Sequence, residues 1–440
     1  MNENGSQILK AGDYRIESLS LHSFVTGDSI NLSGLYRYIE IYEDIFSPYL
    51  TAKIHIEDSL NLPERMPIIG QEKVELVFKT DISQMQKIEL VFRVYKLDSQ
   101  EVMSNGKTQN YVLHLISEGG YFNFSEYCGY SLKGQTSKMV NSVFTKHFPE
   151  SVWKEKLEVE DTNDNYSFVL SKSYNPFKAI SWLASKAHTS TAQDYSPFLF
   201  YETIDGHRFK SVAKIIEDGS ANIIPYLYTP ANVAVPEGEV ESVSFSTVLP
   251  ARYHRIQKLE EMSRFDAVSN IMHGTISSYM EVHDLIRKEV RNHTFYESDV
   301  FDSTRKLGEF NHFRDTDPEA DRLLSKGAAY FYMPSTGYTV HSKSNPIVDN
   351  FQTESMFQKN RHHKNNLLTQ KIMIQVFGDT RRRVGDIVEI IIPKIQSDAH
   401  LFDDPNDKNI GGKYMITSIK HNLATSYVCK YELSRTYMGV

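Results

Sequence analysis

Two short stretches, GQEKVELVF at residues 70–78 and GDIVEIII at residues 385–392, resemble each other and bear most directly on the fold. In each, a glycine leads into a Val-Glu run whose apolar residues recur at every second position, as in a strand. A further strand-like segment follows, and then a Tyr-Val strand, at residues 111–112 and 427–428. Chance similarity is the alternative. If the recurrence is real, it predicts two copies of one β-domain, the second split by an insertion.

The N-terminal part of the chain shows the clearest alternation of apolar and polar residues. The alternating runs lie at residues 50–57, 74–78, 88–95 and 111–115. A period of two is typical of strands that bury one face. We therefore predict that residues 13–118 form the first of two tube-like β-barrel domains, after a disordered start at residues 1–12.

The pattern changes after residue 118, and residues 119–215 predict an α+β domain. Its clearest helix opens at Asn175-Pro176, because Asn caps helix N-termini and Pro suits the first turn. The apolar residues that follow fall on one helix face and are Phe177, Ile180, Leu183 and Ala184. Further along, two strand-like runs flank Asp205-Gly206, a dipeptide typical of hairpin turns.

The rest of the chain divides into a connection and two strand-rich segments with an insertion between them. Glycines and prolines indicate a connection at residues 216–239. Strand-like segments occupy residues 240–297, with a short helix within 264–272, and resume over residues 370–440. The polar, irregular residues 298–369 between them are interpreted as an insertion. The predicted fold is mainly β with α+β parts: two tube-like β-barrel domains, an α+β domain between them and an insertion in the second barrel.

Composition excludes several classes of protein. The 440 residues include 48 Lys and Arg against 56 Asp and Glu, a net charge of −8, so non-specific binding of nucleic acid is not expected. A hydrophobic fraction of 40% suits a folded globular chain. No run of 18 apolar residues predicts a membrane span, and the polar N-terminus does not resemble a signal peptide. Cys128 and Cys429 could form one bridge but no disulfide framework, and they are not spaced to hold zinc.

Catalytic and metal-binding motifs are not found. The sequence has no glycine-rich dinucleotide or phosphate loop, no His-Glu-x-x-His and no Gly-x-Ser-x-Gly. Three groups of side chains are candidate metal ligands: His273, His283 and Asp284; the pair His362-His363 beside Arg361 and Lys364; and the acidic residues Asp398, Asp403, Asp404 and Asp407. The first group reads as ordinary strand positions. The other two read as solvated loops, because the acidic group lacks the spacing of a calcium loop. We therefore expect no enzyme activity, no cofactor and no metal.

One basic run, Arg381-Arg382-Arg383, lies between Gly378 and Gly385. The flanking glycines predict a turn between two strands. One interpretation is a solvated turn. The functional interpretation is that these arginines contact an acidic surface of a partner subunit.

The order of these elements resembles the baseplate hub proteins of contractile-tailed bacteriophages, and the base of the type VI secretion spike, VgrG, is similar in architecture. The strings that carry the resemblance are NPFKAISWLA at 175–184 followed by FLFYET at 198–203, IMHG at 271–274 followed by Asp284-Leu285 and Arg287-Lys288, and VGDIV at 384–388 followed by GGKYMIT at 411–417 and His421. The resemblance covers residues 13–437, and the insertion matches nothing in it.

The resemblance implies a structural protein of the virion tail baseplate, made in the host cytoplasm. Such hubs look like homotrimers in which two tube-like barrels per chain make a pseudo-sixfold ring. One side of the ring meets the hexameric tail tube protein, the other carries the central spike protein, and other baseplate proteins surround it while the genome passes through. Tube-like domains bind neighbours by continuing sheets edge to edge.

Three rival functions remain open. One is the base of a type VI or other contractile injection spike, and another is the hub of a non-contractile tail. The third is a carbohydrate-binding or hydrolytic β-protein, whose expected mark is an exposed aromatic platform.

Overall fold

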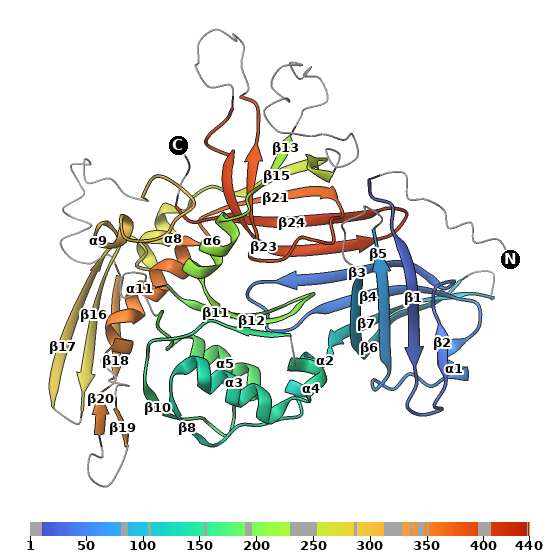
Figure 1. Ribbon diagram of the computed structural model, residues 1–440, viewed down its shortest axis with the longest axis horizontal. Helices are drawn as coiled ribbons and strands as arrows, with labels where there is room; N and C mark the ends of the chain where they lie inside the picture. The colour runs from blue at the N-terminus through green and yellow to red at the C-terminus, as the bar shows by residue number, and fades with distance from the viewer. Residues whose placement is uncertain are drawn as a thin grey trace.

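The structure is a computed structural model and describes residues 11–80, 87–103, 107–153, 156–189, 196–228, 253–285, 288–311, 329–334, 338–340, 347–349, 352–394, 406–437 and 439. Residues 1–10 of the predicted disordered start and residues 229–239 of the predicted connection lie outside these ranges. The described part is mainly β, and in Figure 1 most of the helices lie below or to the left of the two curled sheet regions at the right and the top.

The N-terminal β unit is antiparallel throughout. Its elements are β1 (Arg15–His22), β2 (Ser29–Asn31), β3 (Tyr36–Asp44), β4 (Thr51–Asp58), the short helix α1 (Leu62–Arg65), β5 (Lys73–Lys79), β6 (Ile88–Val102) and β7 (Gln109–Ser117). They pair in the order β3-β4-β7-β6-β5-β1-β2. Every second residue of β4 and β5 is buried, which confirms the strands that the alternation predicted there.

The α+β unit follows with its own apolar core. Its elements are α2 (Glu118–Asn123), β8 (Ser131–Gly134), α3 (Thr136–His147), α4 (Glu150–Trp153), β9 (Leu157–Val159), β10 (Tyr166–Val169), α5 (Pro176–Ala184), β11 (Phe198–Thr203), β12 (Gly206–Ser211) and α6 (Val212–Ser220). The predicted helix start is confirmed, because the Asn175 side chain accepts a hydrogen bond from the Lys178 amide at 2.9 Å. The predicted hairpin is confirmed in β11 and β12.

Gly206 is required by the backbone of this hairpin. Its φ is +127°, a conformation that L side chains rarely adopt, and an added Cβ would lie 2.2 Å from the Lys156 carbonyl oxygen. That close approach lets β12 pair in parallel with β9 on one side while it pairs antiparallel with β11 on the other.

The second β unit is assembled from distant segments. Its strands are β13 (Ile224–Tyr228), β14 (Arg255–Ile256), β15 (Lys258–Ser263), β21 (Gln370–Phe377), β22 (Ile387–Ile391), β23 (Gly412–Leu423) and β24 (Tyr427–Arg435). They pair in the order β15-β21-β24-β23-β22-β13-β14. β13 lies within the region that was expected to be a connection. It is instead part of the sheet, because its residues pair in parallel with β22.

The two β units repeat one strand order. In the first unit the strands lie side by side in the order β3-β4-β7-β6-β5. In the second they lie in the order β15-β21-β24-β23-β22, so each strand of one unit has an equivalent at the same place in the other. The strand that holds Val74 therefore corresponds to the strand that holds Val388, and the two Tyr-Val strings fall on the equivalent strands β7 and β24. This confirms the recurrence predicted from the sequence. The units differ at one edge, where β1 is antiparallel to β5 but β13 is parallel to β22.

In the part of the chain that the structure describes, one strand pairing joins the two units. Residues 418–423 of β23 lie antiparallel to residues 39–44 of β3, so both units belong to one continuous 14-stranded sheet. Figure 1 shows β23 lying beside β3 at the centre of the molecule.

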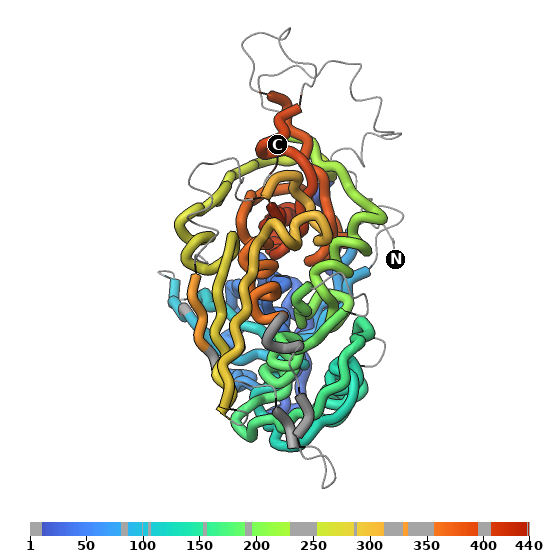
Figure 2. Tube along the Cα trace, turned by 90° about the vertical axis from the view of Figure 1, so that its left-hand side faces the viewer, coloured from blue at the N-terminus to red at the C-terminus, as the bar shows by residue number. Residues whose placement is uncertain are grey.

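The segment between β15 and β21 forms a separate layer at one end of the molecule, seen from that end in Figure 2. Its described elements are α8 (Ala267–Met272), β16 (Ser277–Asp284), β17 (Glu289–Tyr296), α9 (Glu297–Phe301), β18 (Ala329–Pro334), β19 (Tyr338–Val340), β20 (Ile347–Asp349) and α11 (Gln352–Asn366). Among the described strands, β16 pairs only with β17 and β18, so residues 277–296 belong to this layer and not to the second barrel, where the predicted boundary at 297 placed them.

The expectation that His362 and His363 lie in a solvated loop is wrong. Both lie on α11 and are buried, at 0% and 7% exposure. The His362 ring nitrogens contact the Thr275 carbonyl oxygen at 2.6 Å and the Tyr437 hydroxyl at 3.1 Å. Burial lowers the pKa of His363 to about 4. The polar residues around these histidines favour a loop. The sequence does not reveal the contacts, because their partners are distant along the chain.

Among the described residues, no helix combines the length and the apolar character that a membrane crossing requires.

Replacing Leu183 tests the assignment of the α5 core face. Its side chain is fully buried against the α+β core, so we expect Leu183→Ala to lower the free energy of unfolding by about 2–5 kcal/mol. Urea unfolding measures the loss, and Ser181→Ala on the exposed face of the same helix is the control. Unchanged stability together with blocked assembly would show that this face binds a partner.

Candidate partner interface at the junction of the three units

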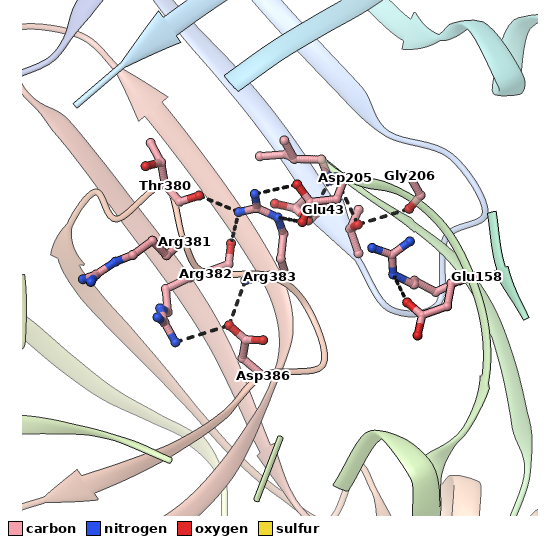
Figure 3. A network of polar contacts seen from close by, with 12 residues as sticks. Glu43, Glu158, Asp205, Gly206, Thr380, Arg381, Arg382, Arg383 and Asp386 are labelled. Carbon is pink, nitrogen blue, oxygen red and sulfur yellow. Dashed lines mark hydrogen bonds and ion pairs between the residues drawn. The ribbon is translucent and has the colours of Figure 1, made fainter. Parts of the chain in front are cut away.

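The predicted turn that carries Arg381-Arg382-Arg383 is present between β21 and β22. Gly385 follows it with a φ of +96°, which favours glycine. The turn faces the β11–β12 hairpin of the α+β unit, and Figure 3 shows the polar contacts between them.

Arg383 joins the turn to the hairpin. Its Nε and Nη2 donate to the two carboxylate oxygens of Asp205 at 2.7 and 2.8 Å. Its Nη1 donates to the carbonyl oxygens of Thr380 and Arg382. Burial raises the pKa of Asp205, but the hydrogen bonds from Arg383 outweigh burial and lower it below its ordinary value. A two-point Arg–carboxylate contact fixes orientation as well as distance, so it sets how the hairpin meets the second β unit.

The other two arginines bind carboxylates of their own turn. Arg381 makes a two-point contact to Asp379, with both distances at 2.9 Å. Arg382 lies 3.5 Å from Asp379 and 3.4 Å from Asp386. In Figure 3 the Arg381 side chain points away from Arg383. Its side chain is 36% exposed, against 9% and 11% for its two neighbours, so Arg381 is the member of the triplet with room to contact a partner.

A cleft of about 330 Å³ opens beside the turn. Its charged lining comes from the hairpin, α6 and the turn and consists of Arg208, Lys210, Asp218, Arg381, Arg382, Arg383 and Asp386. The basic residues of the hairpin have acidic neighbours, since Glu158 lies 3.0 Å from Arg208 and 2.6 Å from Lys210. The cleft is therefore internally charge-balanced and does not form an open site for an anion.

A buried ion pair joins all three units. Glu43 of β3 and His421 of β23 are both 0% exposed, and the His421 Nε2 lies 2.8 Å from a Glu43 oxygen. The second Glu43 oxygen accepts a hydrogen bond from the Ile204 amide in the hairpin turn. The His421 Nδ1 lies 2.7 Å from the Tyr427 hydroxyl. One carboxylate thus contacts both β units and the α+β unit.

His421 is held in its charged form. Burial alone would lower its pKa, but Cys429 and the hydrogen bond and charge of Glu43 together raise the pKa to about 9. Because the ordinary value is near 6.5, the ion pair stabilises the fold fully below about pH 6.5. That stabilisation is lost as the pH rises through about 9.

The structure separates the other candidate ligands that the sequence raised. His283 contacts Glu281 at 2.5 Å, and the neighbouring Asp284 points to the opposite face of β16, where it binds Arg291 at 2.9 Å. The ring of His273 contacts Ser269 on its own helix. Asp407 accepts amide hydrogen bonds within its own turn, while Asp398, Asp403 and Asp404 lie outside the described residues.

Within the described ranges, no group of three or more His, Cys, Asp or Glu side chains is placed to hold a metal ion. Both cysteines are described, and both are buried and free.

From the sequence, His421 was named only as part of the resemblance and Glu43 was not named, although each left a signal of burial. Glu43 continues the buried face of Ile39 and Ile41, and His421 continues the buried face of Ile419 and Leu423. A charged residue at a position where alternation predicts an apolar one needs a buried partner. The alternation marks both positions, but it does not say that they pair.

Neutralising Glu43 tests the ion pair. Glu43→Gln leaves His421 buried without a countercharge, so we expect a loss of about 3–5 kcal/mol in the free energy of unfolding at neutral pH. The decline in stability between about pH 7 and 10 should also become shallower than in the parent. Denaturant unfolding across that range measures both.

The matched control is Glu40→Gln, which removes the outer-face pair with Lys420 from the same two strands and should cost less. Equal losses in the two variants, or an unchanged pH dependence in Glu43→Gln, would contradict the role of the buried pair.

Comparison with known proteins gives a fold. No family model matches the sequence, and neither does any curated protein. Among solved structures, a tail protein from Neisseria meningitidis MC58 aligns with a TM-score of 0.54 at 11% identity, covering 96% of each chain. The 43 kDa tail protein of prophage MuSo2 from Shewanella oneidensis aligns with a TM-score of 0.51 at 9% identity, covering 96% of this chain and 99% of its own. Over nearly its whole length, the chain therefore has the fold of these two tail proteins.

Proposed function

We propose that this chain is a structural component of a phage tail baseplate hub. Three copies form a ring that joins the hexameric tail tube to the central spike and leaves a passage for the genome. The fold shared with two tail proteins supports a structural role in a tail. The base of an injection-system spike or the hub of a non-contractile tail would use the same ring.

One observation carries the proposal, namely the repeated strand order of the two β units. A chain with two similar β units presents two similar surfaces, and three such chains present six. A hexameric tube can then meet a trimer with matched contacts at every position. Closed rotational symmetry also limits the assembly to a ring instead of an open filament.

Within this assembly, Arg381 is the proposed partner contact. Its side chain is the most exposed of the triplet, while Arg382 and Arg383 hold the turn and the hairpin. A carboxylate of a partner subunit can approach Arg381 without disturbing the Arg383–Asp205 contact.

Measuring the mass in solution tests the trimer. Light scattering during gel filtration should give three times the 50.6 kDa of one chain, with a trimer fraction that rises with protein concentration. A monomer at every concentration, with or without purified tube or spike protein, would contradict the proposal.

A second function is favoured by one surface. The face of the β17-β16-β18 sheet opposite α11 presents tyrosines on adjacent strands. Tyr330 and Tyr332 are each 60% exposed. The ring of Tyr279 stacks beside that of Tyr330, with 5.6 Å between the ring centroids. The Tyr330 hydroxyl donates to Glu281, which fixes its ring. Exposed rings beside polar groups suit the apolar and hydroxyl faces of a sugar chain, as expected for a carbohydrate-binding β-protein.

Calorimetric titration with chitohexaose tests this second function. Binding by the parent chain that is lost in a Tyr330→Ala and Tyr332→Ala double variant, but kept in Tyr95→Ala, would support it. Tyr95 is the control because it is 51% exposed on the N-terminal unit. No binding by the parent, or equal binding by all three proteins, would rule this surface out as a glycan site.

A further inference from the structure

The pairing of β3 with β23 inside the chain shows how one β unit binds the next. One edge of β23 is shared by two strands: residues 412–415 pair with β22 and residues 418–423 pair with β3. β23 thus extends past its partner within its own unit, and this overhang binds the edge strand of the other unit.

β6 is the equivalent of β23 in the N-terminal unit, and it overhangs in the same way. Residues 88–93 pair with β5, and the strand continues to Val102. Among the described residues, no strand pairs with the overhang on the β5 side. The equivalent of β3 is β15, which pairs only with β21 in the part of the chain that the structure describes. Each chain therefore presents one overhang and one edge strand that correspond to the two halves of its internal junction.

We infer that β15 of one chain pairs antiparallel with the overhang of β6 in the next chain. This inference rests on the proposed ring, and it names the strands that close it. Contacts around the ring would then alternate between β3 with β23 inside each chain and β15 with β6 between chains.

The internal repeat also sets the register. Leu97 in β6 pairs with the β7 residue that lies two positions after Tyr111. His421 in β23 pairs with the β24 residue that lies two positions after Tyr427, so Leu97 and His421 are equivalent. The residue four positions after Tyr111 pairs with a residue of β4, which in turn pairs with Ile41 in β3. The residue four positions after Tyr427 pairs with a residue of β21, which in turn pairs with Leu259 in β15, so Ile41 and Leu259 are equivalent. His421 lies opposite Ile41 inside the chain. The same geometry therefore places Leu97 of one chain opposite Leu259 of the next.

The charges in this register are complementary. Counting outward from Leu97 and Leu259 in antiparallel strands, Lys96 faces Glu260 and Asp98 faces Lys258. In the single chain each charge is balanced within its own strand, with Lys96 2.5 Å from Asp98 and Lys258 3.3 Å from Glu260. Pairing between chains would place both bridges side by side as cross-strand pairs, which stabilise a sheet.

The apolar residues fit the same register. Leu97 and Leu259 are both partly buried at the margin of the main core. Their counterparts at the internal junction, His421 and Ile41, are fully buried. Forming the second junction would remove the remaining exposed surface of both leucines from water, which favours association.

Cross-linking tests the register directly. In a Leu97→Cys and Leu259→Cys double variant, directly opposed Cβ atoms lie close to disulfide range, so oxidation should link three chains covalently. In a Leu97→Cys and Glu261→Cys variant the cysteines lie on the diagonal, too far apart for an unstrained bond, and should give little product. The parent chain, with Cys128 and Cys429 buried, controls for native cysteines.

Charge exchange tests the pairing without cysteines. Lys96→Glu with Asp98→Lys keeps the pair within β6 but opposes like charges across the interface. The protein concentration needed for half-assembly should then rise at least about ten-fold at low salt. Adding Lys258→Glu with Glu260→Lys restores opposite charges and should return the parent value.

The outcomes separate the two proposals. A trimer that resists charge exchange and gives no linked product from the opposed cysteines overturns the β6–β15 pairing and leaves the ring standing. A chain that forms no trimer under any condition overturns the ring and the pairing together.

Discussion

The pairing of β3 with β23 is the contact on which the rest of the structure depends. It joins strands that lie almost 400 residues apart in sequence and turns two β units into one sheet. The buried pair of Glu43 and His421 lies in this contact, and the Glu43 carboxylate also accepts the Ile204 amide of the hairpin. Removing either charge would leave the other buried without a partner, which is far more costly than losing an exposed pair.

The junction has consequences for how the molecule bears load. A continuous sheet transmits force through backbone hydrogen bonds, so the two β units are expected to move together. The α+β unit is tied to the same place by the Arg383–Asp205 contact. The hub function proposed above would need such a rigid connection. The buried Glu43–His421 pair and the Arg383–Asp205 contact both lie where the three units meet, which is consistent with that need.

Sequence reasoning reached the local features and missed the distant ones. Alternation located strands such as β4 and β5, and the Asn175-Pro176 signal located α5, because each depends on neighbouring residues. The repeat of Val-Glu and Tyr-Val strings identified equivalent strands. The boundary of the insertion and the burial of His362 and His363 were missed, since both depend on partners far along the chain. The Glu43–His421 pair was missed for the same reason, although alternation marked both positions as buried.

Electron microscopy of the purified chain tests the central claim most directly. Averaged end-on images should show a threefold ring with six lobes of similar size around a central opening, because each chain contributes two β units joined through β3 and β23. Particles of a single chain, or rings in which each chain contributes only one lobe, would contradict the account.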